Sequence, residues 1–435
     1  MGAFLGMRGS GDWATDERPK NWRETILFLY PNGSMPLTAI TSKMGSESTD
    51  DAEYNWWTKS LPTQNATVIG MYVDAGFVSA YTSGGVLGSV LYAKVSEAES
   101  KQFRVGHQVL LRDASDSGVD VNAKVTAVSS NGTASYVAVK LLEADDNSSN
   151  SHDLSDCDTM IIIGNINAEG AAMPTGVSYD PVKYYNYTQI FRTPLSITRT
   201  AQLTKYRTGD KYKEMKREAL EMHGIEMEKA FLFGVPTELT GLNGKPERTT
   251  EGIVPFLRRT VPANVNDFAL NASYSGKAWL DDGGGEDWLD AYLETLFRYG
   301  SNEKLAICGS GALLGLNKLA KAGAHMQMTP TQASYGIKVT DWITPFGEIH
   351  LKTHPLFSQE ATLRNAMLIC EPAQMKYRYI TDTKFYAEGD QKAAAGTQGG
   401  RLDGKEEEYL TEAGFEYHHG YTAMFLNGVG LPSAV

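Results

Sequence analysis

The pattern of apolar and polar positions divides the chain into a β-rich first half and a mixed second half. Between about 66 and 175, short apolar runs alternate with turns rich in Gly, Asn and Ser, which is typical of a small barrel or sandwich. Asn131-Gly132 separates two β-rich runs and predicts a hairpin. "TMIIIGNI" (Thr159 to Ile166) predicts a further strand of the buried type.

A strand and a long helix follow. "YYNYTQIFRTPLSITRT" (Tyr184 to Thr200) is rich in aromatic and β-branched residues and predicts a strand, in which Pro194 requires an edge position or a bulge. The segment from about Asp210 to Phe233 predicts the strongest helix, which Gly234 ends. Its apolar stripe is expected at steps of three and four: Tyr212, Met215, Ala219 and Met222, continued by Met227, Ala230 and Phe231.

From about residue 250 onward, helical and strand patterns alternate. "EDWLDAYLETLFRYG" and "SGALLGLNKLAKAG" predict helices, and "KLAIC", "NAMLICEP" and "MKYRYI" predict strands. "YGIKVTDWITPFGEIHLKTHP" predicts two strands around Pro345-Phe346-Gly347. Ala387 to Glu408 predicts a long flexible loop, and His418-His419 falls in a predicted strand of the C-terminal return.

The first 50 or so residues predict an arm rather than a domain. They contain one short apolar run, Ile26 to Tyr30, between charged and turn-rich stretches. A single short strand is not stable alone. We therefore expect this arm to pair with another part of the chain or with another subunit.

Composition narrows the function. The net charge is −12, from 40 basic and 52 acidic residues, which disfavours a protein whose main task is to grip nucleic acid. Three cysteines share no short spacing and predict neither a zinc site nor a disulfide framework: Cys157, Cys308 and Cys370. No apolar run is long enough to span a bilayer, and the N-terminus lacks the pattern of a secretory signal.

Two features suggest chemistry, and both favour a structural interpretation. Gly309, Gly311 and Gly315 lie between a predicted strand and helix, where a dinucleotide fold places its phosphate turn, but the glycine spacing is off by one. His223 lies one helical turn from Glu226, but no second His completes a metal-binding pair, so we expect a surface or interface histidine. The sequence thus predicts no catalytic, cofactor-binding or metal-binding residues.

The order of the segments resembles the major capsid protein of tailed bacteriophages, with the Hong Kong 97-type fold, in the branch that carries a β-rich insertion in the extended loop. The matching stretches, which together cover nearly the whole chain, are "AEYNWWTKSLP", "AEGAAMP" with "YYNYTQIFRTPLSITRT", "MEKAFLFG" and "LAICGSGALLGLNKLA".

The resemblance implies an α+β fold in four parts. These are an N-terminal arm (1–50), an extended β loop (51–200) with a small β-barrel-like insertion (about 66–175), a peripheral domain with a spine helix (201–250) and an α/β axial domain with C-terminal return strands (251–435).

The implied function is assembly rather than catalysis. Hexamers and pentamers of such proteins form an icosahedral shell around double-stranded DNA. The expected partners are many copies of the chain itself, a portal, scaffold or decoration proteins, and DNA through weak non-specific contact, without a membrane. The expected locations are the virion and, during assembly, the host cytoplasm.

Five aromatic residues are the candidates for subunit contact: Trp56, Trp57, Tyr185, Tyr187 and Phe191. Strand alternation sends Trp56 and Trp57 to opposite faces, so that one packs inward and the other meets a neighbouring subunit. The alternative is that both close the junction between the β insertion and the rest of the chain. Two alternative functions stay open: an encapsulin-like nanocompartment shell, and a dinucleotide-binding oxidoreductase built on the 304–320 turn.

Overall fold

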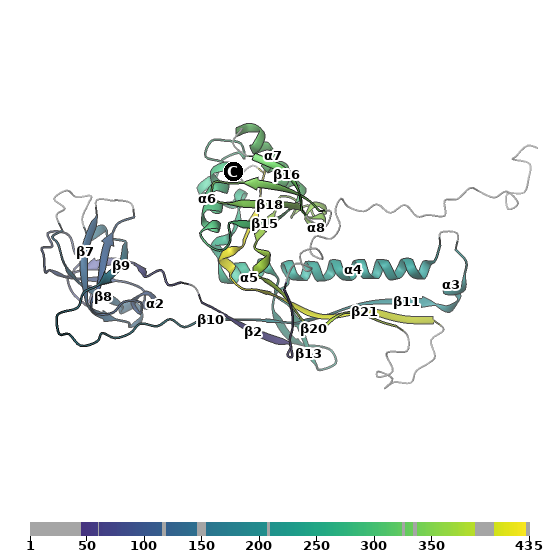
Figure 1. Ribbon diagram of the computed structural model, residues 1–435, viewed down its shortest axis with the longest axis horizontal. Coiled ribbons are helices and arrows are strands. Elements are labelled where there is room, and N and C mark those ends of the chain that lie inside the picture. Colours follow the sequence, from purple (N-terminus) through teal and green to yellow (C-terminus); the bar gives the residue numbers. More distant parts are fainter. Residues whose placement is uncertain are drawn as a thin grey trace, which may run out of the picture. The chain divides into compact units, whose positions relative to one another are not determined.

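The computed structural model describes residues 45–59, 61–114, 119–145, 154–206, 209–323, 327–333, 337–387 and 404–431, with the backbone alone over 327–333 and 337–340. The chain forms two compact units (Figure 1). One, here called the barrel unit, is Lys59–Val182, and the other, the main unit, combines Met1–Thr58 with Lys183–Val435. The predicted apolar run at residues 26–30 and most of the predicted arm lie outside the described residues.

The barrel unit contains one seven-stranded antiparallel sheet in the order β3-β9-β6-β7-β8-β5-β4. Its elements are β3 (Asn65–Thr67), β4 (Gly70–Tyr72), β5 (Val90–Lys94), α2 (Glu97–Ser100), β6 (His107–Arg112), β7 (Asp120–Ser129), β8 (Tyr136–Leu141) and β9 (Thr159–Asn165).

The two outer strands of this sheet, β3 and β4, are consecutive in the chain, and hydrogen bonds of the residues between them link the two edges of the sheet. Between β3 and β4, the Val68 N–H donates to the Asp158 carbonyl at 2.7 Å, and the Ile69 N–H donates to the Lys94 carbonyl at 2.8 Å. The segment from β3 to β4 therefore bonds to strands at both edges of the sheet, which leaves fewer unpaired strand edges.

Alternate side chains of β6, β7 and β8 fill the interior of the barrel unit. The fully buried members are Val109, Leu111, Ala123, Val125, Val137 and Val139. The predicted hairpin at Asn131-Gly132 is confirmed, because a short turn with Gly132 at φ 51° joins β7 to β8. The buried character predicted for β9 is wrong: Met160 is buried, but Ile163 is 48% exposed because successive residues point to opposite faces.

The main unit has a four-stranded sheet, β1-β20-β21-β11, with a long helix, α4, packed along β11 and β21 (Figure 1). The elements here are β1 (Gly45–Ser48), β11 (Gln189–Thr198), α3 (Arg199–Leu203), α4 (Lys211–Phe233), β20 (Met375–Tyr386) and β21 (Gly404–Tyr417). β11 lies at the sheet edge, as Pro194 predicted, and it pairs with β21 without a bulge.

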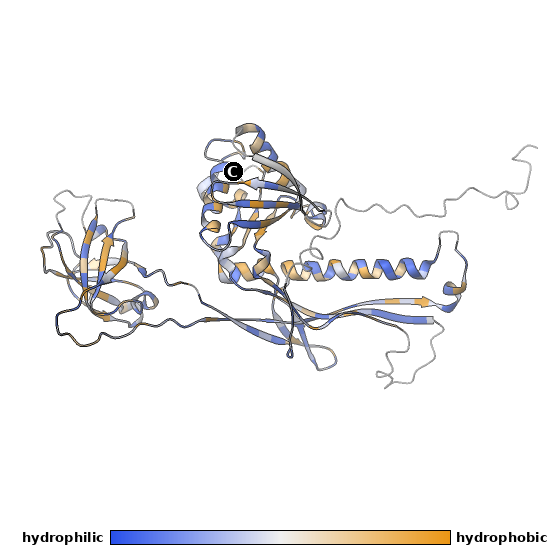
Figure 2. Cartoon of the chain, in the orientation of Figure 1, coloured by the Kyte–Doolittle hydropathy of each residue, from blue (hydrophilic) through white to orange (hydrophobic). Residues whose placement is uncertain are grey.

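The long helix begins and ends where the sequence predicts. The Asp210 carboxylate accepts from the N–H groups of Tyr212 and Lys213, which caps the N-terminus. At the other end a Cβ on Gly234 would lie 2.3 Å from the Thr250 carbonyl, so only glycine fits. Figure 2 shows hydrophilic residues recurring along α4.

The buried face of α4 differs from the predicted stripe. Ala219 is buried as expected, but Met222 is 55% exposed. Phe231 is also buried as expected, and Met227 and Ala230 pack against the same core. The other buried positions are His223, Glu228 and Leu232, two of which are polar. The buried side of the helix includes two polar residues because both have hydrogen-bond partners in the core: His223 with Thr193 and Thr411, and Glu228 with His354.

A second seven-stranded sheet, β14-β22-β19-β15-β18-β17-β16, forms the centre of the remaining part. Its strands are β14 (Val265–Asp267), β15 (Glu303–Cys308), β16 (Gln327–Ala333), β17 (Ile337–Ile343), β18 (Glu348–Thr353), β19 (Met367–Cys370) and β22 (Met424–Asn427). The helices are α5 (Ile253–Thr260), α6 (Gly285–Phe297), α7 (Ser310–Gly323) and α8 (Pro355–Gln359).

Helices pack against both faces of this sheet. Side chains of α6 and α7 share one core with Ala306, Ile349 and Met367, whereas α5 and α8 share another core with Ile307 and Leu368. Neighbouring strand residues thus enter different cores, which explains why the strand sequences are apolar throughout. Among the described residues, no helix is long and apolar enough to cross a membrane.

Two sequence predictions near the C-terminus are wrong. Of the loop predicted over Ala387–Glu408, residues 388–403 lie outside the described residues, and Gly404 to Glu408 belong to β21 rather than to a loop. Glu408 pairs there with Pro194 of β11, and Arg192 neutralises its carboxylate with two hydrogen bonds of 2.7 and 2.8 Å. His418 and His419 follow the end of β21 at Tyr417 rather than lying within it.

Candidate subunit-contact surface

A two-stranded ribbon carries four of the five candidate aromatic residues. It consists of β2 (Glu53–Thr58) and β10 (Val182–Tyr187). Trp56 is 6% exposed and Trp57 is 62% exposed. The prediction that these two residues point to opposite faces is therefore confirmed.

Trp56 packs into the core of the main unit. Its ring centroid lies 6.0 Å from that of Tyr184, 6.1 Å from that of Phe256 and 6.1 Å from that of Tyr54. Phe256 belongs to α5, which also packs on the seven-stranded sheet of the main unit. Trp56 therefore connects the ribbon to this helix. The inward tryptophan is a core residue of its own chain.

The opposite face of the ribbon carries the exposed aromatics. Tyr184 and Asn186 face the core, so alternation places Tyr185 and Tyr187 on the solvent face together with Trp57. Tyr185 is 39% exposed, and its ring centroid lies 5.8 Å from that of Tyr187 at an interplanar angle of 71°. The Arg259 guanidinium lies 5.6 Å from the Tyr185 ring centroid. We call Trp57, Tyr185 and Tyr187 the ribbon patch.

Phe191 lies elsewhere, on β11. It is 6% exposed, and its ring centroid lies 6.2 Å from that of Phe231 on α4. Like Trp56, Phe191 holds its own subunit together. The structure thus separates the five candidates into two interior residues and the three of the ribbon patch.

His223 is buried, so the prediction of a surface or interface histidine is wrong. Its Nδ1 lies 2.9 Å from the Thr193 hydroxyl, and its Nε2 lies 2.7 Å from the Thr411 hydroxyl. Burial lowers the pKa of His223, which favours the neutral imidazole. Two hydroxyls, one on β11 and one on β21, occupy both ring nitrogens, so the residue fastens α4 to the sheet.

Sequence reasoning missed Asn186, which anchors the ribbon. Its side chain is buried, and its Oδ1 accepts from the N–H groups of Glu251 at 2.7 Å and Tyr187 at 2.8 Å. Its Nδ2 lies 2.6 Å from the Phe415 carbonyl and 3.1 Å from the Glu251 carbonyl. The one signal was a lone amide in the aromatic run "YYNY".

The glycine turn before α7 is filled by the chain itself. A Cβ on Gly309 would lie 2.3 Å from the Arg364 carbonyl. That carbonyl also accepts from the N–H groups of Gly311 at 2.9 Å and Ala312 at 3.1 Å. A phosphate would need these same donors. The dinucleotide interpretation of Gly309, Gly311 and Gly315 therefore fails on geometry.

The three cysteines are all buried: Cys157, Cys308 and Cys370. Burial raises the pKa of each thiol to about 12. At neutral pH they are protonated and act as small apolar core residues, since the thiolate is the reactive and metal-binding form.

Comparison with known proteins identifies the class. A family model described as SU10 major capsid protein matches residues 11–430, so this chain belongs to the SU10 major capsid protein family. It is a major capsid protein of a bacteriophage, as the resemblance of its segments predicted.

The chain is also similar to individual proteins. The chain is 24% identical over 407 residues to the major capsid protein of Pseudomonas phage PaMx41, which covers 93% of this chain and 86% of the relative. It is similar in structure to a chain of Microbacterium phage Oxtober96, with a TM-score of 0.45, 9% identity and 98% of each chain covered. It is also similar to the SrpI encapsulin of Synechococcus elongatus, with a TM-score of 0.37, 11% identity and coverage of 57% of this chain and 76% of that one.

Proposed function

We propose that this capsid protein assembles as hexamers and pentamers into an icosahedral shell that encloses double-stranded DNA. The observation that carries the proposal is the family match, which spans residues 11–430. Assembly from many copies needs surfaces that are stable in water yet gain from contact. The ribbon patch has this character, because it combines exposed aromatic rings with the nearby Arg259 guanidinium.

We further propose the division into arm (1–50), extended loop (51–200), peripheral domain (201–250) and axial domain (251–435). In this scheme the barrel-like insertion (about 66–175) belongs to the extended loop, and α4 is the spine helix of the peripheral domain. The scheme assigns the ribbon patch to the base of the extended loop, where a neighbouring subunit would cover it.

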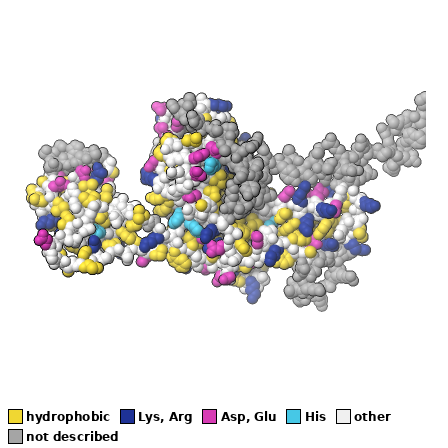
Figure 3. Space-filling view, in the orientation of Figure 1, with side chains coloured by type: hydrophobic (Ala, Val, Ile, Leu, Met, Phe, Trp, Pro, Cys, Tyr) yellow, Lys and Arg dark blue, Asp and Glu magenta, His cyan; other side chains and the backbone are white. Residues whose placement is uncertain are grey.

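The surface charge favours weak contact with the packaged genome. The chain carries a net charge of −12, and acidic and basic side chains are interspersed on the face shown in Figure 3. Nucleic-acid binding relies on clustered cations. We therefore expect weak, salt-sensitive DNA binding. From the family we further expect a portal and scaffold or decoration proteins as partners, and assembly in the host cytoplasm. We expect no enzymatic activity.

Substitution of Trp57 tests the role of the ribbon patch. We expect Trp57→Ser to leave the thermal stability of the unassembled subunit unchanged and to reduce the yield of closed shells in negative-stain micrographs. Buried interface aromatics commonly contribute about 2 kcal/mol or more per contact, and the loss repeats at every copy. Trp57→Tyr, which retains an aromatic ring, should restore assembly.

Trp56→Ala is the matched comparison for folding. It removes an interior ring, so we expect the free subunit to lose about 3–5 kcal/mol of stability. If Trp57→Ser still gave normal closed shells of unchanged heat stability, the ribbon patch would not be a subunit contact. If purified wild-type protein formed no shells at all, the assembly proposal itself would fail.

A further inference from the structure

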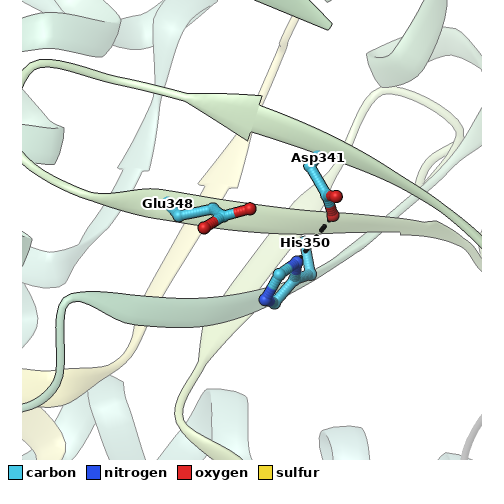
Figure 4. Close-up of side chains that lie close together, drawn as sticks. All are labelled: Asp341, Glu348 and His350. Atoms are coloured by element: carbon cyan, nitrogen blue, oxygen red, sulfur yellow. Dashed lines mark hydrogen bonds and ion pairs between the residues drawn. The ribbon is translucent and has the colours of Figure 1, made fainter. Parts of the chain in front are cut away.

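Three potential metal ligands share one face of the β17–β18 hairpin: Asp341, Glu348 and His350 (Figure 4). The strand register pairs Asp341 with His350, and Glu348 lies two residues before His350 on the same face. One ligand atom from each residue lies within 4.8 Å of those from the other two. Two adjacent strands therefore bring two carboxylates and one imidazole to a single point.

The backbone holds these side chains in place. The sequence neighbours Trp342 and Ile349 point to the opposite face, where both are buried in the core shared with α6 and α7. Neither strand can rotate without exposing these apolar side chains. Asp341 is itself buried, with its Oδ1 2.7 Å from the His350 Nδ1. The ligands thus need only small side-chain movements to converge.

We propose that Asp341, Glu348 and His350 form a binding site for a divalent transition-metal ion of the zinc class. Zinc takes imidazole nitrogen and carboxylate oxygen ligands at about 2.0–2.2 Å, and three protein ligands plus one water complete its tetrahedral shell. An imidazole ligand favours zinc over calcium or magnesium, which prefer oxygen. An ion bound through Nδ1 takes the place of the hydrogen between Nδ1 and Oδ1, and the neutral imidazole then carries its one hydrogen on Nε2.

The ion would crosslink the two arms of one hairpin. The turn between the arms closes with the Thr344 N–H donating to the Gly347 carbonyl at 2.9 Å. A metal bound across the strands adds a second connection beyond that turn. Metal binding at this hairpin does not depend on the shell proposed above.

Calorimetric titration of zinc chloride into the purified full-length protein tests the site. We expect saturable binding of one ion per chain, and binding at least about tenfold weaker in Glu348→Gln and in His350→Asn, because even second-shell changes at zinc sites cost about 10–100-fold. Zinc should also raise the melting temperature of the wild type more than that of either variant, since a ligand that binds the native state stabilises it.

Two control variants distinguish the loss of a zinc ligand from a general effect of removing a charge or a histidine. Glu303→Gln removes an exposed carboxylate that is paired in register with Glu348 on the neighbouring strand, and His418→Asn removes a histidine whose Nε2 lies 2.7 Å from Glu416. Both should bind zinc within about twofold of wild type. The proposal is wrong if no saturable site is found, if Glu303→Gln weakens binding as much as Glu348→Gln, or if calcium chloride binds more tightly than zinc chloride.

Discussion

Replacing Asn186 with leucine, which has a similar shape, should destabilise the main unit strongly. The side chain is 1% exposed, and it bonds to its own strand at Tyr187 and to two distant segments, at Glu251 and Phe415. Leucine fills the space but neither donates nor accepts hydrogen bonds. The substitution therefore removes the bonds without leaving a cavity.

The loss of unfolding free energy in Asn186→Leu follows from the groups that lose their hydrogen-bond partner. Two backbone N–H groups, those of Glu251 and Tyr187, lose their acceptor at 2.7 and 2.8 Å. Each buried donor without a partner costs about 1–3 kcal/mol. The Phe415 carbonyl keeps the Tyr54 hydroxyl as a donor at 2.8 Å, so it adds less. After the gain from burying an apolar side chain, we expect a net loss of about 3 kcal/mol.

Tryptophan fluorescence during urea unfolding of the free subunit measures this loss. All seven tryptophans lie within Met1–Thr58 or Lys183–Val435, so the emission reports on the main unit and not on the barrel unit. Asn186→Leu should lower the urea midpoint at an unchanged slope, since the surface exposed on unfolding stays the same.

Asn55→Leu, on the partner strand, is the matched control. The Asn55 Oδ1 is buried without a hydrogen-bond partner in the described part of the chain, and its Nδ2 makes one long bond of 3.4 Å to Glu53. We expect a change within about 0.5 kcal/mol. A midpoint for Asn186→Leu equal to wild type, or an equal loss in Asn55→Leu, would refute the reasoning.

Two further predictions concern the α7 helix and the dependence on pH. Gly315→Ala normally favours a helix by about 1 kcal/mol, but here the new Cβ would lie 2.6 Å from the Gly430 Cα, so calorimetry should show a lower melting temperature. Burial alone would raise the pKa of Glu416, but hydrogen bonds from His418 and Arg378 outweigh it and hold this pKa below its ordinary value. A lowered folded-state pKa gives stability that is present above about pH 4.3, the unfolded value, and is lost as the pH falls through the folded value. Glu416→Gln should therefore reduce the loss of urea stability on acidification, and an acid dependence like that of wild type would contradict this assignment.

Local signals allowed much of the fold to be predicted. The ends of α4 follow from the Asp210 cap and Gly234, and the edge position of β11 follows from Pro194, because each depends on the chemistry of one residue. The predicted strand KLAIC and the following helix lie at β15 and α7, because the apolar pattern of a short segment is also a local signal.

Predictions failed where polar residues are buried. Counting apolar side chains assigned Met222 to the core, but His223 and Glu228 occupy it because Thr193, Thr411 and His354 satisfy them. Such partners are distant in sequence and become visible only when the chain is folded. The same reason hid Asn186 and the strand character of Glu408.

The ribbon of β2 and β10 has a consequence for how this chain can change. The barrel unit begins at Lys59, directly after β2, and ends at Val182, where β10 begins, and these two strands are hydrogen-bonded neighbours. Both attachment points of the barrel unit therefore lie on one pair of strands. In evolution the barrel unit can be exchanged, enlarged or reduced to a turn without a shift in the register between β2 and β10. In the laboratory, it is a natural place to graft a foreign antigen for display on particles.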